Sequence, residues 1–438
     1  MKSYNIITYG CQMNAHESEK LAYILESKGY IPANGNDDAD IIIFNTCCVR
    51  ENAERKAFGN IGKLKALKAE KPELIIAVCG CMTQQEGVSD KLIKKFPFLD
   101  VVFGTFNIDS FWDYLKERDK RGKSVVEVLA HENAVSEEHG YKRENTVHAF
   151  VNIMYGCNNF CTYCIVPHVR GRERSRSEDA IVGEVKSLLE SGYREITLLG
   201  QNVNSYGHDL GGPGSFAALL DKLGALPYKC RIKFMTSHPK DLSVEVVEAI
   251  SRHKNLSKNI HLPIQSGSNE ILGRMNRRYT REHYLKLVEI IRQKLEGCGL
   301  TTDLMIGFPG ETEADFEQTM DIVRQVRFSG AFTFVYSPRS GTPAAKFPDQ
   351  LDDDTLKRRI IRLVELQNSI TSEINAEYVG NVFEVLVDGK DAKREGCMCG
   401  RTESGKLVSF EGKEELLGKF VNIKINRSSM ASLQGELA

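Results

Sequence analysis

The chain has 438 residues, enough for roughly three domains at about 150 residues each. Hydrophobic residues make up 41% and charged residues 27%, which is typical of globular proteins and excludes a chain dominated by disorder. The formal net charge of -1 excludes a surface that is basic throughout, so any nucleic-acid site has to be a local patch. No apolar run is long enough to span a bilayer, and we expect a cytoplasmic protein. In that reducing compartment the 12 cysteines are read as metal ligands, catalytic thiols or core residues rather than disulfides.

The first segment, to about residue 120, alternates short apolar strands with polar helical patterns. Strands are expected at 4–9, 40–45 and 74–78, which predicts a small parallel α/β domain. A cysteine follows the end of each expected strand: Cys11, Cys47 and Cys81. Because the ends of parallel strands meet at one edge of a sheet, we expect these three thiols to converge and form a candidate metal site.

Two neighbouring cysteines leave the ligands of this site open. Cys48 follows Cys47 directly, and Cys79 lies two residues before Cys81, so periodicity does not choose within either pair. Cys79 closes an apolar run and fits the core of a strand. The residues around Cys48 give no comparable argument.

Residues 121–146 are charged and lack helical periodicity apart from a brief strand-like stretch, which predicts a linker between domains. From residue 147 to about 375 a longer series of strands alternates with helices, among them helices at 177–191, 281–295 and 313–328. Repeated strand and helix pairs over this length predict a TIM-type barrel, complete or partial. In such barrels the chemistry lies at the C-terminal ends of the strands.

The first strand of this series leads into a loop that carries Cys157, Cys161 and Cys164 within eight residues. Thiolates select zinc, copper(I) or iron–sulfur clusters, and the short gaps let one loop surround a single centre. A four-iron cluster held by three thiolates keeps one iron without a protein ligand, where a small molecule can bind and react. A zinc site with His168 as fourth ligand is one alternative. A second alternative is that the three cysteines lie on one face of a helix and are core residues, but Pro167 disfavours a helix here.

Arginines alternate directly after this loop: Arg170, Arg172, Arg174 and Arg176. In an extended segment all of them project to one face, where they can meet phosphate or a ligand carboxylate. A solvated charged edge is the common alternative.

The pattern changes to short strands, separated by glycine and charged turns, over residues 376–438. These strands predict a small all-β, OB-like barrel of about 60 residues, a size that suits oligonucleotide binding. A stabilising cap is the alternative, and the nearly balanced charges argue against a grip on RNA by phosphate attraction alone. Cys397 and Cys399 have no second pair nearby and are read as incidental thiols.

Taken together, the motifs resemble the methylthiotransferases of the radical S-adenosylmethionine (SAM) superfamily over nearly the whole chain. The resemblance rests on an ordered set of stretches: YGCQMN, NTCCVREN, CGCMTQ, CNNFCTYCIVPHVRGRERSR, LLGQNVNSYG, HLPIQSGSNEILGRMNRRYTRE and DLMIGFPGETEADF. Within the family, YGCQMN, NTCCVREN and GQNVNSYG are most similar to the tRNA-modifying MiaB branch. One departure is Ser340, where the family pattern has proline, which affects the expected shape of that loop but no ligand.

The resemblance implies a division of the chain into an N-terminal methylthiotransferase domain at 1–120, a linker at 121–146, a radical SAM barrel at 147–375 and a TRAM domain at 376–438 that binds RNA. It also implies two four-iron clusters with three cysteine ligands each. Cys157, Cys161 and Cys164 match the radical SAM ligands, and Cys11, Cys47 and Cys81 match those of an auxiliary cluster. Cys48 and Cys79 match no ligand position.

The implied activity converts N6-isopentenyladenosine to 2-methylthio-N6-isopentenyladenosine at tRNA position 37, just 3′ to the anticodon. The radical SAM cluster would reduce SAM to a 5′-deoxyadenosyl radical that removes hydrogen from an unactivated adenine carbon, chemistry that side chains do not supply. The auxiliary cluster would carry the sulfur, and a second SAM would donate the methyl group. The expected partners are the isopentenylated tRNA, an electron donor such as flavodoxin or ferredoxin, and a sulfur source. The alternatives are the same reaction on N6-threonylcarbamoyladenosine in tRNA and a zinc-stabilised RNA-binding module without catalysis.

Candidate contacts to SAM are expected on the active face of the barrel: Gln201 and Asn202 after one strand, and Asp303 and Gly307 within the stretch TTDLMIGFPGE. Ordinary turns at strand ends are the alternative reading of these residues. The arginines beside the cysteine loop are the candidate contacts to the tRNA substrate: Arg170, Arg172 and Arg174. No catalytic side chain is expected beyond the cluster ligands.

Overall fold

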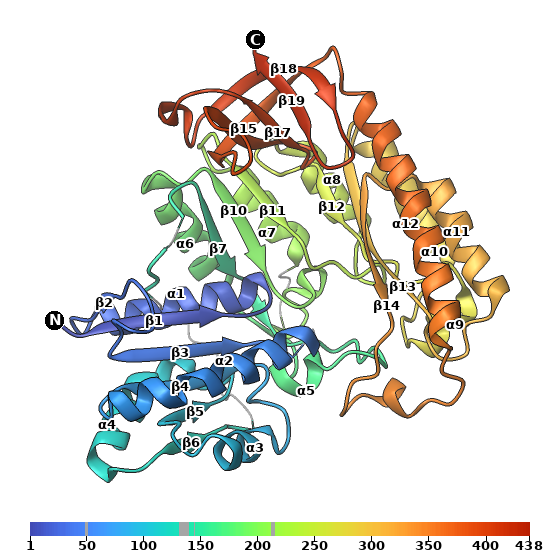
Figure 1. Cartoon of the computed structure of the whole chain (residues 1–438). Coiled ribbons are helices and arrows are strands. Elements are labelled where there is room, and N and C mark those ends of the chain that lie inside the picture. The colour runs from blue at the N-terminus through green and yellow to red at the C-terminus, as the bar shows by residue number, and fades with distance from the viewer. Residues whose placement is uncertain (49–50, 131–139, 144, 212–214) are drawn as a thin grey trace. The chain divides into compact units, whose positions relative to one another are not determined.

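The chain divides into two compact units (Figure 1). The first unit comprises Met1–Glu144, Met154–Asn158 and Cys164–Ala180, and the second comprises Asn145–Ile153, Asn159–Tyr163 and Ile181–Ala438. The structure, a computed structural model, describes residues 1–48, 51–130, 140–143, 145–211 and 215–438, with only the backbone at 51–53. No helix in the described part of the chain is long and apolar enough to cross a membrane.

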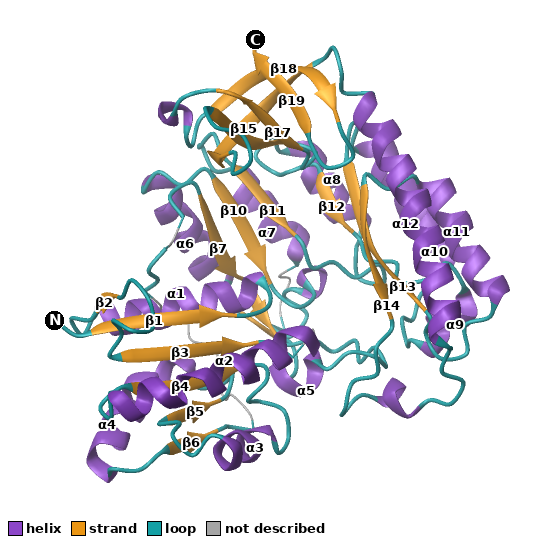
Figure 2. Ribbon diagram, viewed as in Figure 1, coloured by secondary structure: helices purple, strands orange, loops and turns teal. Residues whose placement is uncertain are grey.

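The first unit is built on a six-stranded parallel sheet in the order β2-β1-β3-β4-β5-β6 (Figure 2). Its strands are β1 (Ser3–Thr8), β2 (Ile31–Pro32), β3 (Ile41–Thr46), β4 (Ile75–Gly80), β5 (Val101–Phe103) and β6 (Val125–Glu127). Its helices are α1 (Gln12–Glu26), α2 (Glu51–Glu70), α3 (Val88–Lys95) and α4 (Phe111–Arg121), with the short η1 (Ile108–Ser110). The expected parallel α/β fold is confirmed, and the sheet takes its last strand from the stretch that the sequence assigned to the linker.

Hydrophobic cores cover both faces of this sheet. Along β3 the side chains alternate between the faces: Ile41 and Ile43 pack with α1 and α4, whereas Ile42 and Phe44 pack with α2 and α3. Strands that are buried on both faces read as continuous apolar runs, which is why β3 and β4 were recognisable in the sequence. Three short elements from later in the chain complete the unit: β8 (Met154–Tyr155), α5 (Val166–Arg170) and β9 (Arg174–Ser175).

The second unit contains a partial barrel made of two three-stranded parallel sheets, in the orders β11-β10-β7 and β12-β13-β14. Its strands are β7 (His148–Asn152), β10 (Glu195–Leu199), β11 (Arg231–Phe234), β12 (Asn259–His261), β13 (Gly299–Ile306) and β14 (Gly330–Val335). The helices between them are α6 (Glu178–Glu190), α7 (Phe216–Gly224), α8 (Val244–Arg252), α9 (Asn269–Arg274), α10 (Arg281–Lys294) and α11 (Glu313–Val326), with the short η2 (Val203–Ser205). This arrangement confirms the partial form of the expected barrel.

A long helix leads from the partial barrel to the C-terminal domain. Helix α12 (Asp353–Ala376) follows the short η3 (Pro343–Lys346) and buries Leu363 and Ile370 on the side that packs against β14 and α11. Its Gln367 Nε2 donates to the Phe328 carbonyl oxygen at 2.9 Å. The helix is therefore packed along its length as part of the barrel wall.

The C-terminal domain is a closed five-stranded barrel in the order β15-β16-β17-β19-β18. Its elements are β15 (Val382–Lys390), β16 (Cys397–Thr402), β17 (Leu407–Glu411), η4 (Glu414–Leu416), β18 (Phe420–Ser428) and β19 (Leu433–Leu437). Alternate residues such as Val385, Val387, Ile423 and Ile425 point inward and are completely buried, as closure of a small barrel requires. The expected small all-β domain is confirmed.

One turn of this small barrel packs against the N-terminal ends of the partial barrel's strands. We call residues 403–406, which join β16 to β17, the docking turn. Ser257 Oγ, just before β12, donates to the Glu403 carbonyl oxygen at 3.0 Å. At the start of β13, a Cβ added to Gly299 would lie 2.0 Å from the Ser404 carbonyl oxygen. The docking turn thus packs directly against the backbone of Gly299, a contact that any side chain at this position would block.

A lysine closes the other side of the docking turn. Lys406 Nζ donates to the Ser329 carbonyl oxygen, just before β14, at 2.9 Å. Burial lowers the pKa of Lys406 to about 8, against the opposing effect of Glu377. The hydroxyl groups of Tyr378 and Ser404 lie 2.8 Å apart and share a hydrogen bond. Polar contacts therefore hold the small barrel on the partial barrel.

Candidate metal centres and ligand site

The structure brings the three cysteines of the first unit to one edge of its sheet. Cys47 directly follows β3, Cys81 directly follows β4, and Cys11 precedes the first residue of α1. Gly10, with a φ of +113°, makes the turn before Cys11, and a Cβ added there would lie 2.8 Å from the Cys47 sulfur. Glycine at this position thus lets the Cys47 side chain lie against the turn that carries Cys11.

Asn14 connects the strand ends that carry these cysteines. Its Nδ2 donates to the carbonyl oxygens of Tyr9 and Thr46, both at 2.9 Å. Its Oδ1 lies 3.7 Å from the Cys11 sulfur and 3.9 Å from the Cys81 sulfur. The side chain is completely buried, so one amide fixes two strand ends and faces two of the candidate ligands.

Cys48 and Cys79 differ clearly in their surroundings. Cys79 lies in the hydrophobic core of the sheet, as its apolar run indicated. Cys48 packs with Cys81, Ile165 and Val169 in a small buried cluster. The hydrogen bond from Cys48 lowers the pKa of the Cys81 thiol to about 7, aided by the positive charge of Arg170 and opposed by burial. The same bond, together with burial, raises the pKa of Cys48, so Cys81 is the more acidic thiol of the pair.

The predicted row of arginines is wrong as a single extended segment. Arg170 is the last residue of α5, whereas Arg174 begins β9. Arg170 and Arg176 are buried, Arg172 is exposed, and the Arg174 guanidinium lies over the Phe106 ring at 5.3 Å from its centroid. A proline and a short apolar run in IVPHVR start a helix that strict alternation of arginines did not reveal.

Arg170 does not present its guanidinium to solvent, as a contact to tRNA would require. Only 4% of the residue is exposed, and its Nε donates to the Cys81 sulfur at 3.2 Å. Its Nη2 donates to Asn14 Oδ1 and to Glu17 Oε2, both at 3.0 Å. The candidate substrate contact thus lies at the cysteine edge of the sheet.

Backbone pairing between β8 and β9 holds the base of the loop that carries Cys157, Cys161 and Cys164. Cys157 N donates to the Gly171 carbonyl oxygen at 3.1 Å. Gly156, with a φ of +77°, passes so close that an added Cβ would lie 1.9 Å from the Arg172 carbonyl oxygen. Glycine before the first cysteine is therefore required for the loop to close.

Cys161 belongs to the second unit and has a buried arginine beside it. Arg277 is 5% exposed, and its Nη1 donates to the Cys161 sulfur at 3.4 Å. Its Nη2 donates to the Pro263 carbonyl oxygen at 2.8 Å, which fixes the side chain. The sequence predicted no role for Arg277, because nothing in its stretch indicates which of several arginines is buried.

The donor chemistry of both cysteine sets fits a thiolate-bound metal centre. In the described ranges no three Cys, His, Asp or Glu side chains already stand in a coordinating arrangement. Soft thiols with buried arginines beside Cys81 and Cys161 suit zinc or an iron–sulfur cluster and exclude a calcium or magnesium site. His168 is exposed on α5. The ligand assignment to the six cysteines remains a prediction.

Buried polar atoms gather at the C-terminal ends of the partial barrel's strands. Each residue of this group follows a strand and has a buried side-chain atom without a hydrogen-bond partner among the described residues: Asn202, Thr236, Ser237, His238, Gln265 and Tyr336. Burial of a polar atom without a partner costs free energy. Their concentration at this end therefore marks a site for a polar ligand.

His238 contributes a defined donor to this polar site. Its Nδ1 accepts a hydrogen bond from the Lys240 backbone N–H at 3.2 Å, so the ring proton lies on Nε2, the atom without a partner among the described residues. Burial lowers the pKa of His238 to about 2, and the charges of Arg277 and Lys240 also act to lower it. The imidazole is therefore neutral and offers a single N–H to a ligand.

Of the four candidate SAM contacts, three follow the ends of strands. Gln201 and Asn202 follow β10, and Asn202 Nδ2 donates to Asp241 Oδ2 at 2.7 Å, whereas its Oδ1 is buried without a partner among the described residues. Gly307 follows β13 with a φ of +73°. Asp303 lies inside β13, with its Oδ1 3.5 Å from the Nε2 of His261. Their roles as SAM contacts remain predictions.

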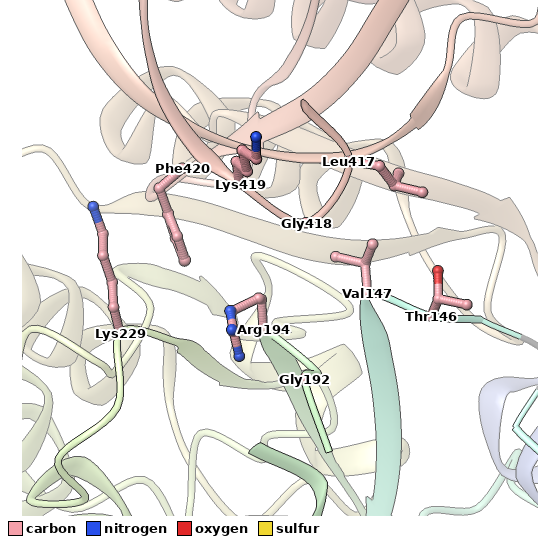
Figure 3. A pocket seen from close by; sticks show the side chains of 9 residues that line it. All are labelled: Thr146, Val147, Gly192, Arg194, Lys229, Leu417, Gly418, Lys419 and Phe420. Carbon is pink, nitrogen blue, oxygen red and sulfur yellow. The ribbon is translucent and has the colours of Figure 1, made fainter. Parts of the chain in front are cut away.

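A basic groove lies between the small barrel and the N-terminal ends of β7 and β10 (Figure 3). It has a volume of about 630 Å³ and is lined by Thr146, Val147, Gly192, Arg194, Lys229, Leu417, Gly418, Lys419 and Phe420. Figure 3 shows Phe420 extending toward Arg194, with Lys229 alongside. Lys229 pairs with Glu384, whereas no carboxylate in the described ranges pairs with Arg194 or Lys419.

Three family models match successive parts of the chain. Residues 3–104 match the uncharacterized protein family UPF0004, residues 151–323 match the radical SAM superfamily, and residues 376–438 match the TRAM domain. Among solved structures, the radical S-adenosylmethionine methyltransferase TsrM from Kitasatospora setae is similar, with a TM-score of 0.59 and 13% identity over 79% of this chain and 75% of that one. This likeness establishes the fold alone.

Relatives of known name match almost the whole chain. A tRNA-2-methylthio-N(6)-dimethylallyladenosine synthase from Clostridium botulinum is 52% identical over 431 residues, which cover 98% of this chain and 96% of the relative. An enzyme of the same name from Carboxydothermus hydrogenoformans is 52% identical over 436 residues, which cover 100% of this chain and 99% of the relative. The chain therefore belongs to the tRNA-2-methylthio-N(6)-dimethylallyladenosine synthase family of radical SAM methylthiotransferases.

Proposed function

We propose that this protein converts N6-isopentenyladenosine to its 2-methylthio derivative at tRNA position 37. Full-length relatives at 52% identity carry the name of this activity, with dimethylallyl as the synonym of isopentenyl. The structural observation that carries the proposal is the edge of the first sheet, where Cys11, Cys47 and Cys81 follow neighbouring strands. A second set of three thiols, apart from the radical SAM loop, is what a sulfur-inserting enzyme needs beyond radical generation.

The cofactors of this proposal are SAM and two four-iron clusters. One cluster would be held by Cys157, Cys161 and Cys164. The other would be held by the edge cysteines of the first unit, which are Cys11, Cys47 and Cys81. The first cluster would supply the one-electron reduction of SAM, chemistry that allows hydrogen to be taken from an unactivated adenine carbon. A one-electron donor such as flavodoxin or ferredoxin and a sulfur source complete the proposed reaction, which we place in the cytoplasm with the tRNA substrate.

The chain's own residues prepare the sites for these groups. Arg277 donates to the Cys161 sulfur and is fixed in place by the Pro263 carbonyl oxygen. The unpartnered polar atoms at the strand ends, including the Nε2–H of His238, supply hydrogen bonds to a polar molecule such as SAM. These groups orient a bound molecule without changing their own protonation state, since the low pKa of His238 keeps its ring neutral across the working pH range.

Mass spectrometry of tRNA nucleosides tests the function directly. In a strain that lacks this protein, we expect loss of the 2-methylthio mark with N6-isopentenyladenosine retained. Restoration by the wild-type chain but not by a Cys81→Ala variant ties the mark to the edge cysteines. Persistence of the mark in the deletion strain, or loss of methylthio from N6-threonylcarbamoyladenosine instead, contradicts the proposal.

Metal analysis tests the cofactors. After anaerobic purification we expect about eight irons and a similar amount of sulfide per chain, as two four-iron clusters require. Stoichiometric zinc without iron contradicts the enzyme and favours an RNA-binding module held together by zinc.

A further inference from the structure

We propose that Arg170 is a positioning residue of the auxiliary cysteine site, where it holds the Cys81 sulfur and supplies the buried positive charge of the site. This inference rests on the proposed function, because it assumes that the edge cysteines hold a cluster. It replaces the role as a tRNA contact that alternation of the arginines predicted for Arg170.

The guanidinium of Arg170 is fixed from several directions. Both of its Nη atoms bind the Glu17 carboxylate, and Nη2 also donates to Asn14 Oδ1 at 3.0 Å. Only Nε remains, and it points to the Cys81 sulfur at 3.2 Å. Because Glu17 and Arg170 are each 4% exposed and Asn14 is completely buried, water does not compete for these donors.

A bidentate pair leaves the guanidinium only one orientation. Glu17 and Asn14 both lie on α1, whose first residue directly follows Cys11, so the same helix that begins at one candidate ligand aims an arginine at another. Nearby groups that donate hydrogen bonds to ligand atoms fix ligand geometry and tune the metal they hold. The contact of Arg170 Nε with the Cys81 sulfur has this geometry.

The charges around Cys81 also favour a cation at this place. Glu17 is negatively charged and a deprotonated Cys81 would add a second negative charge, and the Arg170 guanidinium contacts both groups and offsets their charge. A buried ion pair contributes little net stability, since desolvation of its charges offsets their attraction. The contact with the Cys81 sulfur therefore explains the presence of this pair better than its contribution to folding does.

The position of Arg170 in the chain adds a connection between the two cysteine sets. Helix α5 begins at Val166, two residues after Cys164, and ends at Arg170. The segment that carries ligands of the radical SAM set thus extends directly into the donor for the auxiliary set. Val169 and Ile165 of the same segment pack against Cys81, which anchors α5 by apolar contact as well.

A protein with only the auxiliary cluster isolates the effect. In a Cys157→Ala, Cys161→Ala, Cys164→Ala parent, we expect about four irons per chain, held by the edge cysteines. Arg170→Lys keeps the positive charge but does not reproduce the planar fork, so it retains the cluster with a more negative reduction potential, since the hydrogen bond to sulfur is removed. Arg170→Met loses most of the remaining iron.

Arg118→Met is the matched control. Arg118 lies in the same unit and also binds a carboxylate through two nitrogens, with Nε and Nη2 of Arg118 at 3.1 and 2.8 Å from Asp100 Oδ1. We expect this variant to keep the iron content and reduction potential of the parent. A general effect of breaking a half-buried ion pair would appear in Arg118→Met as well.

The outcomes separate this inference from the function on which it rests. If Arg170→Lys keeps both the parental iron content and the parental potential, the proposal is wrong, whatever Arg170→Met does. If Arg170→Lys in the full chain instead weakens tRNA binding with an unchanged potential, Arg170 is a substrate contact and the proposal is again wrong. A triple-alanine parent without iron refutes the two-cluster function itself, and the role of Arg170 with it.

Discussion

Cys79 and Cys81 are two residues apart on the chain but have different chemical environments. Cys79 is the fifth residue of β4 and lies among apolar side chains, whereas Cys81 follows the strand and contacts Cys48 and Arg170. Core position and ligand position are therefore separable by mutation at almost the same point of the sequence.

The cysteine variants are expected to separate metal binding from stability. Cys81→Ala should lower the iron content from about eight to about four per chain, because one of two four-iron clusters loses a ligand. Cys79→Ala should keep the iron but lower the free energy of unfolding by about 1 kcal/mol, through a small cavity in the core. Iron analysis and chemical denaturation measure the two effects. Loss of iron from Cys79→Ala with iron retained in Cys81→Ala would reverse the ligand assignment.

Arg172 and Arg174 remain the candidate contacts to tRNA or SAM. Arg172 is exposed, and the Arg174 guanidinium contacts the rings of Phe106 and Tyr155, at 5.3 and 5.9 Å from their centroids. We expect the Arg172→Ala, Arg174→Ala double variant to bind tRNA or SAM about tenfold or more weakly, on the order of 1.4 kcal/mol, at unchanged iron content. Equilibrium binding to each ligand measures the change, and unchanged affinity for both refutes the assignment.

His238 gives a sharper test of the polar site in the second unit. His238→Ala removes the unpartnered Nε2–H, and we expect SAM affinity to fall by about 1 kcal/mol or more, the value of a neutral hydrogen bond in a buried site. Because the pKa of His238 is about 2, its ring stays neutral between about pH 5 and 8. We therefore expect SAM binding to depend on pH in the same way in the wild type and in His238→Ala over this range. A limb of the pH profile in that range that disappears in His238→Ala would contradict a neutral imidazole.

At the scale of elements, the strands that precede Cys47 and Cys81 were predictable because β3 and β4 are buried on both faces and read as apolar runs. The strand β6 was less evident, since it has three residues and only Val125 of them is buried. Asn14 and Arg170 were not predictable as parts of the cysteine site. Their roles depend on contacts between residues more than 60 positions apart, which local patterns do not encode.

The docking turn is another element whose role only the fold reveals. Its lysine is titratable near neutral pH, because burial lowers the pKa of Lys406 to about 8 from 10.5. At pH values at which this buried lysine is protonated, its charge lowers the free energy of unfolding. As pH rises from about 8 to about 10, the folded state releases this proton before the unfolded state does, so stability increases over this window.

A Lys406→Met variant tests this pH dependence. The melting temperature of the wild type, relative to that of Lys406→Met, should increase between about pH 8 and pH 10 and stay constant between about pH 6 and pH 7. Thermal unfolding followed at each pH gives the difference. A constant difference across the whole range would show that the lysine keeps an ordinary pKa in the folded protein.

At the scale of the whole molecule, a net charge near zero means that attraction of phosphates depends on local excesses of positive charge. The basic groove is such a place, because no carboxylate lines it and Arg194 and Lys419 have no acidic partner in the described ranges. Its aromatic Phe420, with Lys229 Nζ 4.8 Å from the ring centroid, adds a surface on which a base can stack.

Salt dependence measures the contribution of this groove to tRNA binding. We expect the Arg194→Ala, Lys419→Ala double variant to bind tRNA more weakly and to lower the slope of log K against log salt by about two, one for each phosphate that is no longer neutralised. Lys413→Ala and Lys424→Ala, on the same small barrel but outside the groove, serve as a matched control pair. An unchanged slope in the groove variant would show that tRNA is held elsewhere.

The composition of the first unit has a consequence for how the protein is made. Its sheet is complete in sequence at β6, yet the unit also needs residues 154–158 and 164–180. When only the residues of the sheet have left the ribosome, Arg170 has not yet emerged. Glu17 then lacks its ion-pair partner, and the Cys81 sulfur lacks its hydrogen-bond donor. We therefore expect the cluster to enter the edge cysteines only after residue 180, the last residue of the first unit, has left the ribosome. Synthesis of the sheet alone would not be enough.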